Sequence, residues 1–134
     1  MKTDIIIPTY KPDEKFLSLM DMLLKQSVQA EKIIIYNTEK QFFEKLISEK
    51  DFLKRYENAE LYHIEQREFD HGHTRNAARA HSDGDIIVYM TQDAVPKDEK
   101  MLERLLEGLK SDDVWVAYAR QVVPADAVIT EHFT

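Results

Sequence analysis

Cysteine is absent from the sequence, which excludes a disulfide framework, a thiolate nucleophile and a cysteine-ligated zinc site. Glycine is scarce, with 3 residues among 134, and no repeat, low-complexity tract or flexible linker interrupts the chain. A chain without cysteine is compatible with a reducing compartment. We therefore expect a cytoplasmic location, at the inner face of the membrane if the chain belongs to a longer protein.

Positive charge is also in deficit, because 18 Lys and Arg stand against 25 Asp and Glu, a net charge of −7. Nucleic acids and anionic bilayers are bound through clustered cations, so neither is an expected partner. No apolar run approaches the roughly 20 residues that span a membrane, and Ile5–Ile7 is too short for the core of a signal peptide. An anionic ligand would need positive charge supplied locally.

What remains is ordinary for a globular domain, with 43% hydrophobic and 32% charged residues. A length of 134 residues suits one domain covering residues 1–134. The stretch that follows Pro124 shows no closing element of its own, so we expect the chain to be part of a longer protein. The oligomeric state is not indicated by any pattern.

Short apolar runs rich in Ile, Val and Tyr predict five buried parallel strands, at Asp4–Pro8, Lys32–Tyr36, Glu60–Ile64, Asp85–Met90 and Val114–Ala119. Helical spacing of apolar residues between them predicts four helices. One begins near Asp13, and the others carry Phe42, Phe43, Leu46, Ile47 and Phe52; then Ala77, Ala78 and His81; then Leu102, Leu105, Leu106 and Leu109.

This alternation of strands and helices predicts an α/β fold, a doubly wound, mainly parallel sheet with flanking helices. Ligands of such sheets bind outside the carboxyl ends of the strands, so functional residues should directly follow each strand. Gly84 stands between a helical segment and the fourth strand, where a left-handed residue is expected to end the helix.

The first two strands are each followed by a short polar segment. Pro8 is expected to stop strand pairing and to leave Thr9 and Tyr10 at the carboxyl edge, where a hydroxyl and a ring could meet a nucleotide. A plain turn into the next helix is the alternative. After the second strand, Asn37 and Glu39 could hydrogen-bond a base or ribose, unless Asn37 or the neighbouring Thr38 is a helix N-cap.

The densest polar stretch, residues 67–76, follows the third strand. Arg75 lies beside the expected start of a helix, and a helix N-terminus with a nearby guanidinium is a natural phosphate site. The alternative is a metal site made by Asp70, His71 and His73, since imidazole and carboxylate suit divalent transition metals.

Asp93 follows the fourth strand, which should be central in the sheet. A carboxylate aimed into a cleft is costly unless it is paired or bound to a metal, although a helix cap or a turn is the alternative. After the fifth strand, Arg120 and Gln121 set a cation and an amide at the same rim, with an ion pair or strand-end hydrogen bonds as their alternative.

Four segments together resemble family 2 glycosyltransferases of the GT-A fold, and more narrowly the bacterial rhamnosyltransferase-like members: Ile6–Tyr10, Phe69–Asn76, Thr91–Pro96 and Ala119–Gln121. The resemblance implies a Rossmann-like, nucleotide-binding half of the GT-A fold. It also implies inverting transfer of a sugar, with rhamnose as a candidate, from a dTDP- or UDP-linked donor to a glycan or lipid-linked acceptor. The product would be a cell-surface polysaccharide.

The same resemblance assigns roles to individual residues. Asp93 would hold Mg²⁺ or Mn²⁺, the cation that neutralises the departing diphosphate. The implied donor-binding residues are Pro8, Thr9 and Tyr10 around the nucleoside, Asn37 and Glu39 near base or ribose, Arg75 along the donor, and Gln92 beside Asp93.

Three departures from the family pattern matter. Thr91 stands where the DxD motif has its leading Asp, which leaves the metal one protein carboxylate, so diphosphate and water would complete its shell. The base-contacting Asp after the second strand is replaced around Asn37 to Glu39, which leaves uridine and thymidine both open. The catalytic base is expected beyond Thr134.

Two other functional classes are compatible with parts of the pattern. A metal-dependent hydrolase would use Asp70, His71, His73 and Asp93. A noncatalytic α/β binding module, such as a signalling receiver domain, would need an acidic cluster after the first strand, where this chain has Pro8 and Thr9 instead.

Overall fold

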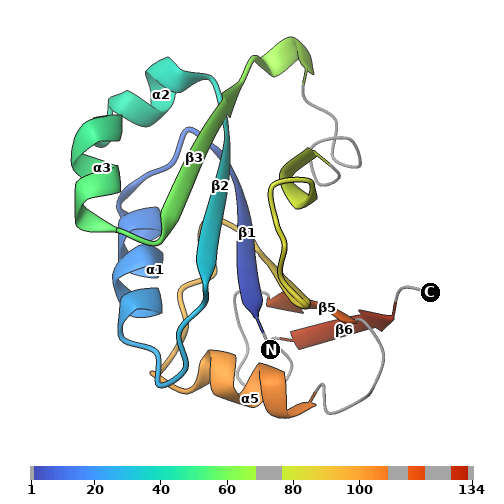
Figure 1. The fold of residues 1–134 in the computed structure, drawn as a ribbon. Coiled ribbons are helices and arrows are strands. Elements are labelled where there is room, and N and C mark those ends of the chain that lie inside the picture. The colour runs from blue at the N-terminus through green and yellow to red at the C-terminus, as the bar shows by residue number, and fades with distance from the viewer. Residues whose placement is uncertain (1, 69–76, 109–114, 120–127, 133–134) are drawn as a thin grey trace.

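A six-stranded sheet organises the computed structural model, which describes residues 2–68, 77–108, 115–119 and 128–132 (Figure 1). The strand order is β3-β2-β1-β4-β5-β6. Strands β1 to β5 pair in parallel, and β6 pairs antiparallel with β5. The predicted mainly parallel α/β sheet is confirmed, with strand bounds Thr3–Tyr10 (β1), Lys32–Thr38 (β2), Ala59–Ile64 (β3), Ile86–Met90 (β4), Trp115–Ala119 (β5) and Val128–His132 (β6).

Strand β6 was not predicted, so the expectation of no closing element after Pro124 is wrong. Val128, Ile129 and Thr130 are β-branched residues that favour a strand. They align antiparallel with β5, in a register that pairs Ala119 with Val128. An antiparallel last strand at the sheet edge is common in otherwise parallel sheets.

Four helices cover one face of the sheet, at Glu14–Leu24 (α1), Lys40–Glu44 (α2), Glu49–Arg55 (α3) and Met101–Gly108 (α5). Their apolar side chains pack with alternate strand residues into one buried core, which includes Ile5, Ile7, Phe16, Phe43 and Phe52. The intervening strand residues, such as Ile6 and Ile34, face the opposite side, where the helical residues 77–79 contribute Ala78 (Figure 1). Within the described residues no helix has the length and apolar character to cross a membrane.

The N-cap residues determine where the helices begin, and they show which of the predicted helices were right. Asp13 is the N-cap of α1, as predicted, and its carboxylate accepts a hydrogen bond from the Lys15 amide at 3.0 Å. The single helix predicted through Phe42 and Phe52 is wrong, because a second N-cap divides it into α2 and α3. The hydroxyl of Ser48 accepts from the Asp51 amide at 3.2 Å and starts α3.

Gly84 lies just before β4 and does not have the predicted left-handed backbone, because no described glycine has a positive φ. The need for glycine at this position comes from close packing instead. A Cβ at this position would lie 3.0 Å from the Cγ and Oδ2 atoms of Asp4 and 3.2 Å from the Ile86 carbonyl oxygen. Asp4 is fully buried, and its Oδ2 accepts from the Ser82 hydroxyl at 2.5 Å. A side chain at position 84 would press against this fully buried carboxylate.

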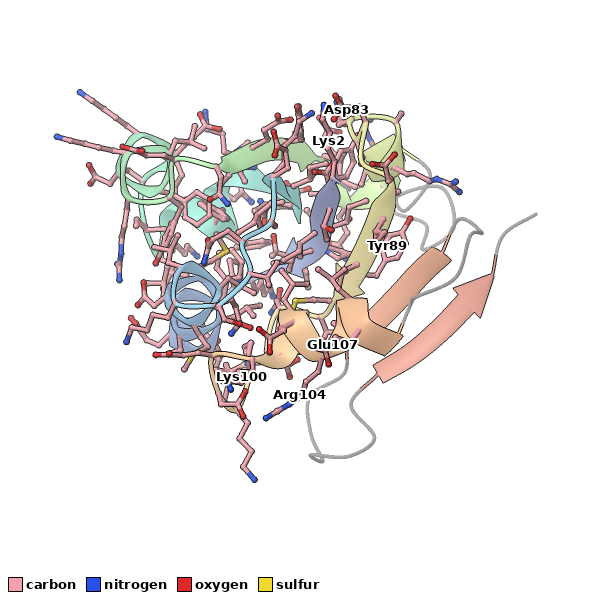
Figure 2. All side chains as sticks on the ribbon, turned by 60° about the horizontal axis from the view of Figure 1, so that its bottom comes forward. Lys2, Asp83, Tyr89, Lys100, Arg104 and Glu107 are labelled. Carbon is pink, nitrogen blue, oxygen red and sulfur yellow. The ribbon has the colours of Figure 1, made fainter. Side chains whose placement is uncertain are left out.

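Charged residues surround this amino edge of the sheet. The ammonium group of Lys2 lies 3.7 Å from the Asp83 carboxylate, and the two side chains are neighbours in Figure 2. Lys32 lies 3.5 Å from Asp83 and 3.7 Å from Glu60. The positive charges of Lys32 and Lys2 lower the pKa of Asp83. These ion pairs lie at the surface, where they are partly or largely exposed, and contribute little to folding stability.

An aromatic group lies on the face opposite the four helices. The rings of Tyr62 and His81 stack with centroids 3.9 Å apart, and Tyr36 lies beside both. The Tyr62 hydroxyl donates to Glu60 Oε1 at 2.6 Å. This hydrogen bond, with partial burial and the negative charge of Glu60, raises the pKa of Tyr62 to about 12.

Candidate functional site

The carboxyl ends of β1, β2 and β3 meet at one rim, where the strand register aligns three polar residues. Thr9 pairs with Asn37, and Asn37 pairs with His63. The Thr9 hydroxyl donates to Asn37 Oδ1 at 2.8 Å, inside the protein. The His63 ring follows, with Nδ1 3.1 Å from Asn37 Nδ2 and Nε2 3.0 Å from Glu49 Oε1 of α3. One polar row therefore crosses three strands and ends on a helix.

The side chain of Asn37 is fully buried and uses both of its N–H groups. Nδ2 donates to the Glu39 carbonyl at 3.0 Å and faces His63 Nδ1. This arrangement makes Nδ1 the acceptor on His63 and leaves Nε2–H to donate to Glu49. The alternative in which Asn37 or Thr38 caps the following helix is wrong, because residue 39 occupies the cap position. Contact between Asn37 and a nucleotide stays a prediction.

Glu39 directly precedes α2 in a left-handed backbone conformation, with φ 69°, and its side chain makes no capping bond. Non-glycine residues adopt this region at a cost, so surrounding contacts must hold it there. The Glu39 amide donates to the Ile64 carbonyl at 2.7 Å, and its Oε1 accepts from the Gln66 amide at 2.9 Å. Glu39 thus fastens the turn after β2 to the segment after β3, where Gln66–Glu68 forms a short 3-10 helix (η1).

Tyr10 ends β1 and is 40% exposed. The ring meets Phe42 of α2 edge to face, with centroids 5.9 Å apart. Lys11 has its ammonium nitrogen 5.3 Å from the Tyr10 ring centroid and 4.9 Å from that of Phe42, and Lys45 lies 5.2 Å from Phe42. We name Tyr10, Lys11, Phe42 and Lys45 the aromatic–lysine cluster. It places two cations at the rim of a chain whose net charge is −7.

The loop after β4 is tied to the end of β1 through Gln92. Its Oε1 accepts from the Tyr10 amide at 2.8 Å, and its Nε2 donates to the Tyr10 carbonyl at 3.1 Å. The next residue, Asp93, lies in a turn in which the Ala94 amide donates to the Thr91 carbonyl at 3.1 Å. Tyr10 and Asp93 are thereby brought to the same rim.

Asp93 is partly buried, and within the described part of the chain its carboxylate has no hydrogen-bond or ion-pair partner. A carboxylate in that position suits a cation. The described residues contain no group of three His, Asp or Glu side chains that could hold a metal by themselves. Among the described residues Asp93 is therefore a single carboxylate, and the alternative ligands Asp70, His71 and His73 lie outside that part of the chain.

The predicted site residues fall into two groups. Pro8, Thr9, Tyr10, Asn37, Glu39, Gln92 and Asp93 all lie at or near the carboxyl edge, as the strand pattern predicted. The others lie outside the described residues, namely Arg75, the alternative metal ligands Asp70, His71 and His73, and the pair Arg120 and Gln121.

Sequence reasoning missed three residues of the rim. His63 is the single imidazole inside β3, one residue before the end of that strand, and aligned strand ends would have placed it beside Asn37. Phe42 was assigned to the core by its helical spacing. Lys11, with φ 48°, turns back over Tyr10, and no sequence signal announces a left-handed lysine.

Comparison with curated proteins finds two relatives that are 28% identical to this chain. One is the O-antigen chain rhamnosyltransferase RfbN of Salmonella typhimurium, matched over 95% of this chain and 39% of its own length. The other is the O-antigen chain rhamnosyltransferase WbaN of Salmonella anatum, matched over 92% of this chain and 38% of its own length. The chain thus spans about two fifths of the relatives it matches.

Solved structures share the fold at low sequence identity. Residues 1–349 of S. aureus TarS superpose with a TM-score of 0.60 at 18% identity, covering 80% of this chain and 32% of that one. A complex of the same protein with UDP-GlcNAc gives 0.55 at 18% identity, over 80% and 30%. A CMP:2-keto-3-deoxy-manno-octonic acid synthetase gives 0.59 at 11% identity, over 84% and 48%.

At these identities the solved structures show the fold alone. The family comparison is more specific. The model of the family described as Glycosyl transferase family 2 matches residues 4–132, nearly the whole chain. The chain belongs to glycosyl transferase family 2.

Proposed function

We propose that this chain is the donor-binding part of an inverting glycosyltransferase, which moves a sugar from a nucleoside diphosphate to a hydroxyl of a glycan or lipid-linked acceptor. Family membership supports sugar transfer. The names of the two Salmonella relatives support rhamnose as the sugar and O-antigen as the product class. The S. aureus complex with UDP-GlcNAc supports a nucleotide sugar as donor.

One observation carries the proposal for this chain. Gln92 joins the end of β1 to the loop after β4, so that the exposed Tyr10 and the carboxylate of Asp93, which has no partner among the described residues, share one rim. A partly exposed aromatic ring suits a nucleoside, and a carboxylate without a described partner suits a cation bound to a diphosphate. The two groups thus match the two ends of a nucleoside diphosphate.

The proposal assigns roles to the following residues of the rim. The Tyr10 ring stacks on the base, with Thr9, Asn37 and Glu39 shaping the floor toward uridine or thymidine. Lys11 offers positive charge to the diphosphate. Asp93 would hold Mg²⁺ or Mn²⁺, which when bound supplies charge neutralisation to the diphosphate as it leaves.

Calorimetric titration of the chain with UDP and with dTDP, each with and without Mn²⁺, tests the proposal. We expect Mn²⁺ to tighten nucleotide binding by about tenfold, and Asp93→Asn to remove that gain. Asp83→Asn is the matched control, because Asp83 is an exposed carboxylate at the amino edge of the sheet. Failure of the folded chain to bind either nucleotide, or an unchanged Mn²⁺ effect in Asp93→Asn, would refute the proposal.

The alternative of a metal-dependent hydrolase predicts a different result when metal is titrated into the chain. A hydrolase built on Asp70, His71, His73 and Asp93 would bind a divalent metal without nucleotide, because its ligands all come from protein. The donor-binding proposal predicts metal binding only when nucleotide is present. Titration of Mn²⁺ into the ligand-free chain separates the two, and a receiver-type module would bind neither nucleotide.

A further inference from the structure

The hydrogen-bonded ladder between β1 and β4 stops before β1 ends. Its last pair is Ile6 with Tyr89, whereas β1 continues to Tyr10 and stays paired with β2 up to Thr38. The final residues of β1 therefore pair with a neighbouring strand on one side, β2, and not on the other. The side of these residues that lacks strand pairing faces β4 and the loop after it, which carries Asp93.

Proline explains why this ladder stops. The backbone groups of successive strand residues point to opposite neighbours. The Thr3 carbonyl accepts from Glu31 on the β2 side, and the Lys2 carbonyl accepts from Ile86 on the β4 side. Even-numbered residues of β1 thus face β4, and Pro8 is one of them, with no N–H to donate. The prediction that Pro8 stops pairing is right toward β4 and wrong toward β2.

The side chain of Gln92 replaces the missing rung. Tyr10 is the next even-numbered residue, and its N–H and carbonyl both face the amide of Gln92, at 2.8 and 3.1 Å. A carboxamide presents one acceptor and one donor side by side, as a peptide group of a neighbouring strand does. The contact joins residues 82 positions apart in the sequence.

We propose that Gln92 is a positioning residue that couples nucleoside binding at Tyr10 to cation and diphosphate binding at Asp93. This inference rests on the proposed donor site and deepens it. Gln92 was predicted to contact the donor, but both groups of its amide are engaged with the Tyr10 backbone. It acts through the two residues it holds in register.

The coupling has a measurable form, because coupled sites change each other's affinity by the same factor. In the wild-type chain, Mn²⁺ should tighten nucleotide binding. Gln92→Met keeps the length of the side chain and removes both hydrogen bonds. We expect it to reduce the Mn²⁺ effect from about tenfold to less than about threefold, with a smaller change in nucleotide affinity without metal.

Gln92→Glu adds a test that a purely structural role would not pass. At about pH 8 its carboxylate accepts from the Tyr10 amide but repels the Tyr10 carbonyl, so the Mn²⁺ effect should be weak. Acidification to about pH 5 protonates part of the population, and a carboxylic acid offers the same donor and acceptor pair as the amide. The Mn²⁺ effect should recover relative to the control at the same pH.

The control is Gln41→Glu, which makes the same change on an exposed side chain of α2. Amide exchange by NMR gives a readout without any ligand. The Tyr10 amide should exchange at least about tenfold faster in Gln92→Met, and should stay protected in Gln92→Glu, which keeps the acceptor. Equal exchange in Gln92→Met and wild type would overturn the rung itself.

The remaining outcomes separate this inference from the proposed function. If the wild-type chain binds nucleotide and both Gln92 variants keep the full Mn²⁺ effect, the coupling is wrong and the donor site stands. If the wild-type chain binds no nucleotide, the donor site is wrong and the coupling fails with it. Recovery of Gln92→Glu on acidification, absent in Gln41→Glu, would support the coupling specifically.

Discussion

Gly84→Ala places a side chain where the protein leaves almost no space. The new methyl group would lie 3.0 Å from two atoms of the Asp4 carboxyl and 3.2 Å from the Ile86 carbonyl oxygen. Forcing an extra carbon into a packed site costs about 1–3 kcal/mol. The backbone at Gly84 has no positive φ, so alanine also stabilises by about 0.4–1 kcal/mol through the unfolded chain. The net expectation is a loss of about 1 kcal/mol, within a range of about 0–2.6 kcal/mol.

Urea unfolding followed by circular dichroism measures this loss, and a double-mutant cycle identifies its cause. In an Asp4→Ala background the closest atoms are gone, and only the Ile86 carbonyl remains near. The cost of Gly84→Ala should then fall below about 0.5 kcal/mol, because the interaction energy between two contacting residues is lost when one of them is truncated. Equal costs in the two backgrounds would refute the reasoning, because the clash with Asp4 would not be the reason for glycine.

Two further predictions concern hydrogen bonds described above. Asn37→Leu should lower the free energy of unfolding, measured with urea, by about 2–4 kcal/mol, because it leaves the buried Thr9 hydroxyl without its acceptor. The control Asn58→Leu breaks one hydrogen bond of 3.3 Å and should lower the free energy of unfolding by less than half as much. Glu60→Gln should move the pKa of Tyr62 from about 12 toward its ordinary value near 10, measured by phenolate absorbance after subtraction of a Tyr62→Phe titration. Because the folded pKa is the higher one, this contribution to stability is complete below about pH 10 and is lost as the pH rises toward 12. An unchanged phenolate midpoint in Glu60→Gln would contradict the assignment.

Strands β1 to β5 were predictable because each is a short, mainly apolar run, and such runs are typical of strands in a parallel sheet. The rim followed from the same signal, since parallel strands end at one edge. Asp13 was predictable as a helix start because a carboxylate before an apolar helical pattern caps the first turn. These inferences use only local sequence.

The division between α2 and α3 was missed although Ser48 and Asp51 show the spacing of a capped helix start. The apolar spacing from Phe43 to Phe52 runs through the break, because both rings enter the same core and lie 5.2 Å apart. Periodicity reports which side chains are buried. It does not report whether the backbone between them is continuous.

Gly84 and Gln92 were misinterpreted for a different reason. Both are explained by partners about 80 positions away in the sequence, Asp4 and Tyr10. A local pattern offers a turn for the glycine and a ligand contact for the glutamine. The strand order that brings β1 beside β4 is needed to see that one residue leaves space and the other fills a gap in the ladder.

Lys11 and Glu39 adopt left-handed backbone conformations where most proteins would place glycine, and each directly follows a strand that enters the rim. A glycine there would sample many conformations before a ligand arrived, and binding would have to select one of them. A lysine and a glutamate have fewer accessible conformations than a glycine, and hydrogen bonds with Ile64 and Gln66, at the end of β3 and just after it, hold Glu39 in the left-handed one despite its cost. The rim is thus preorganised, so that the entropy of shaping it is lost during folding and does not weaken the binding of a ligand.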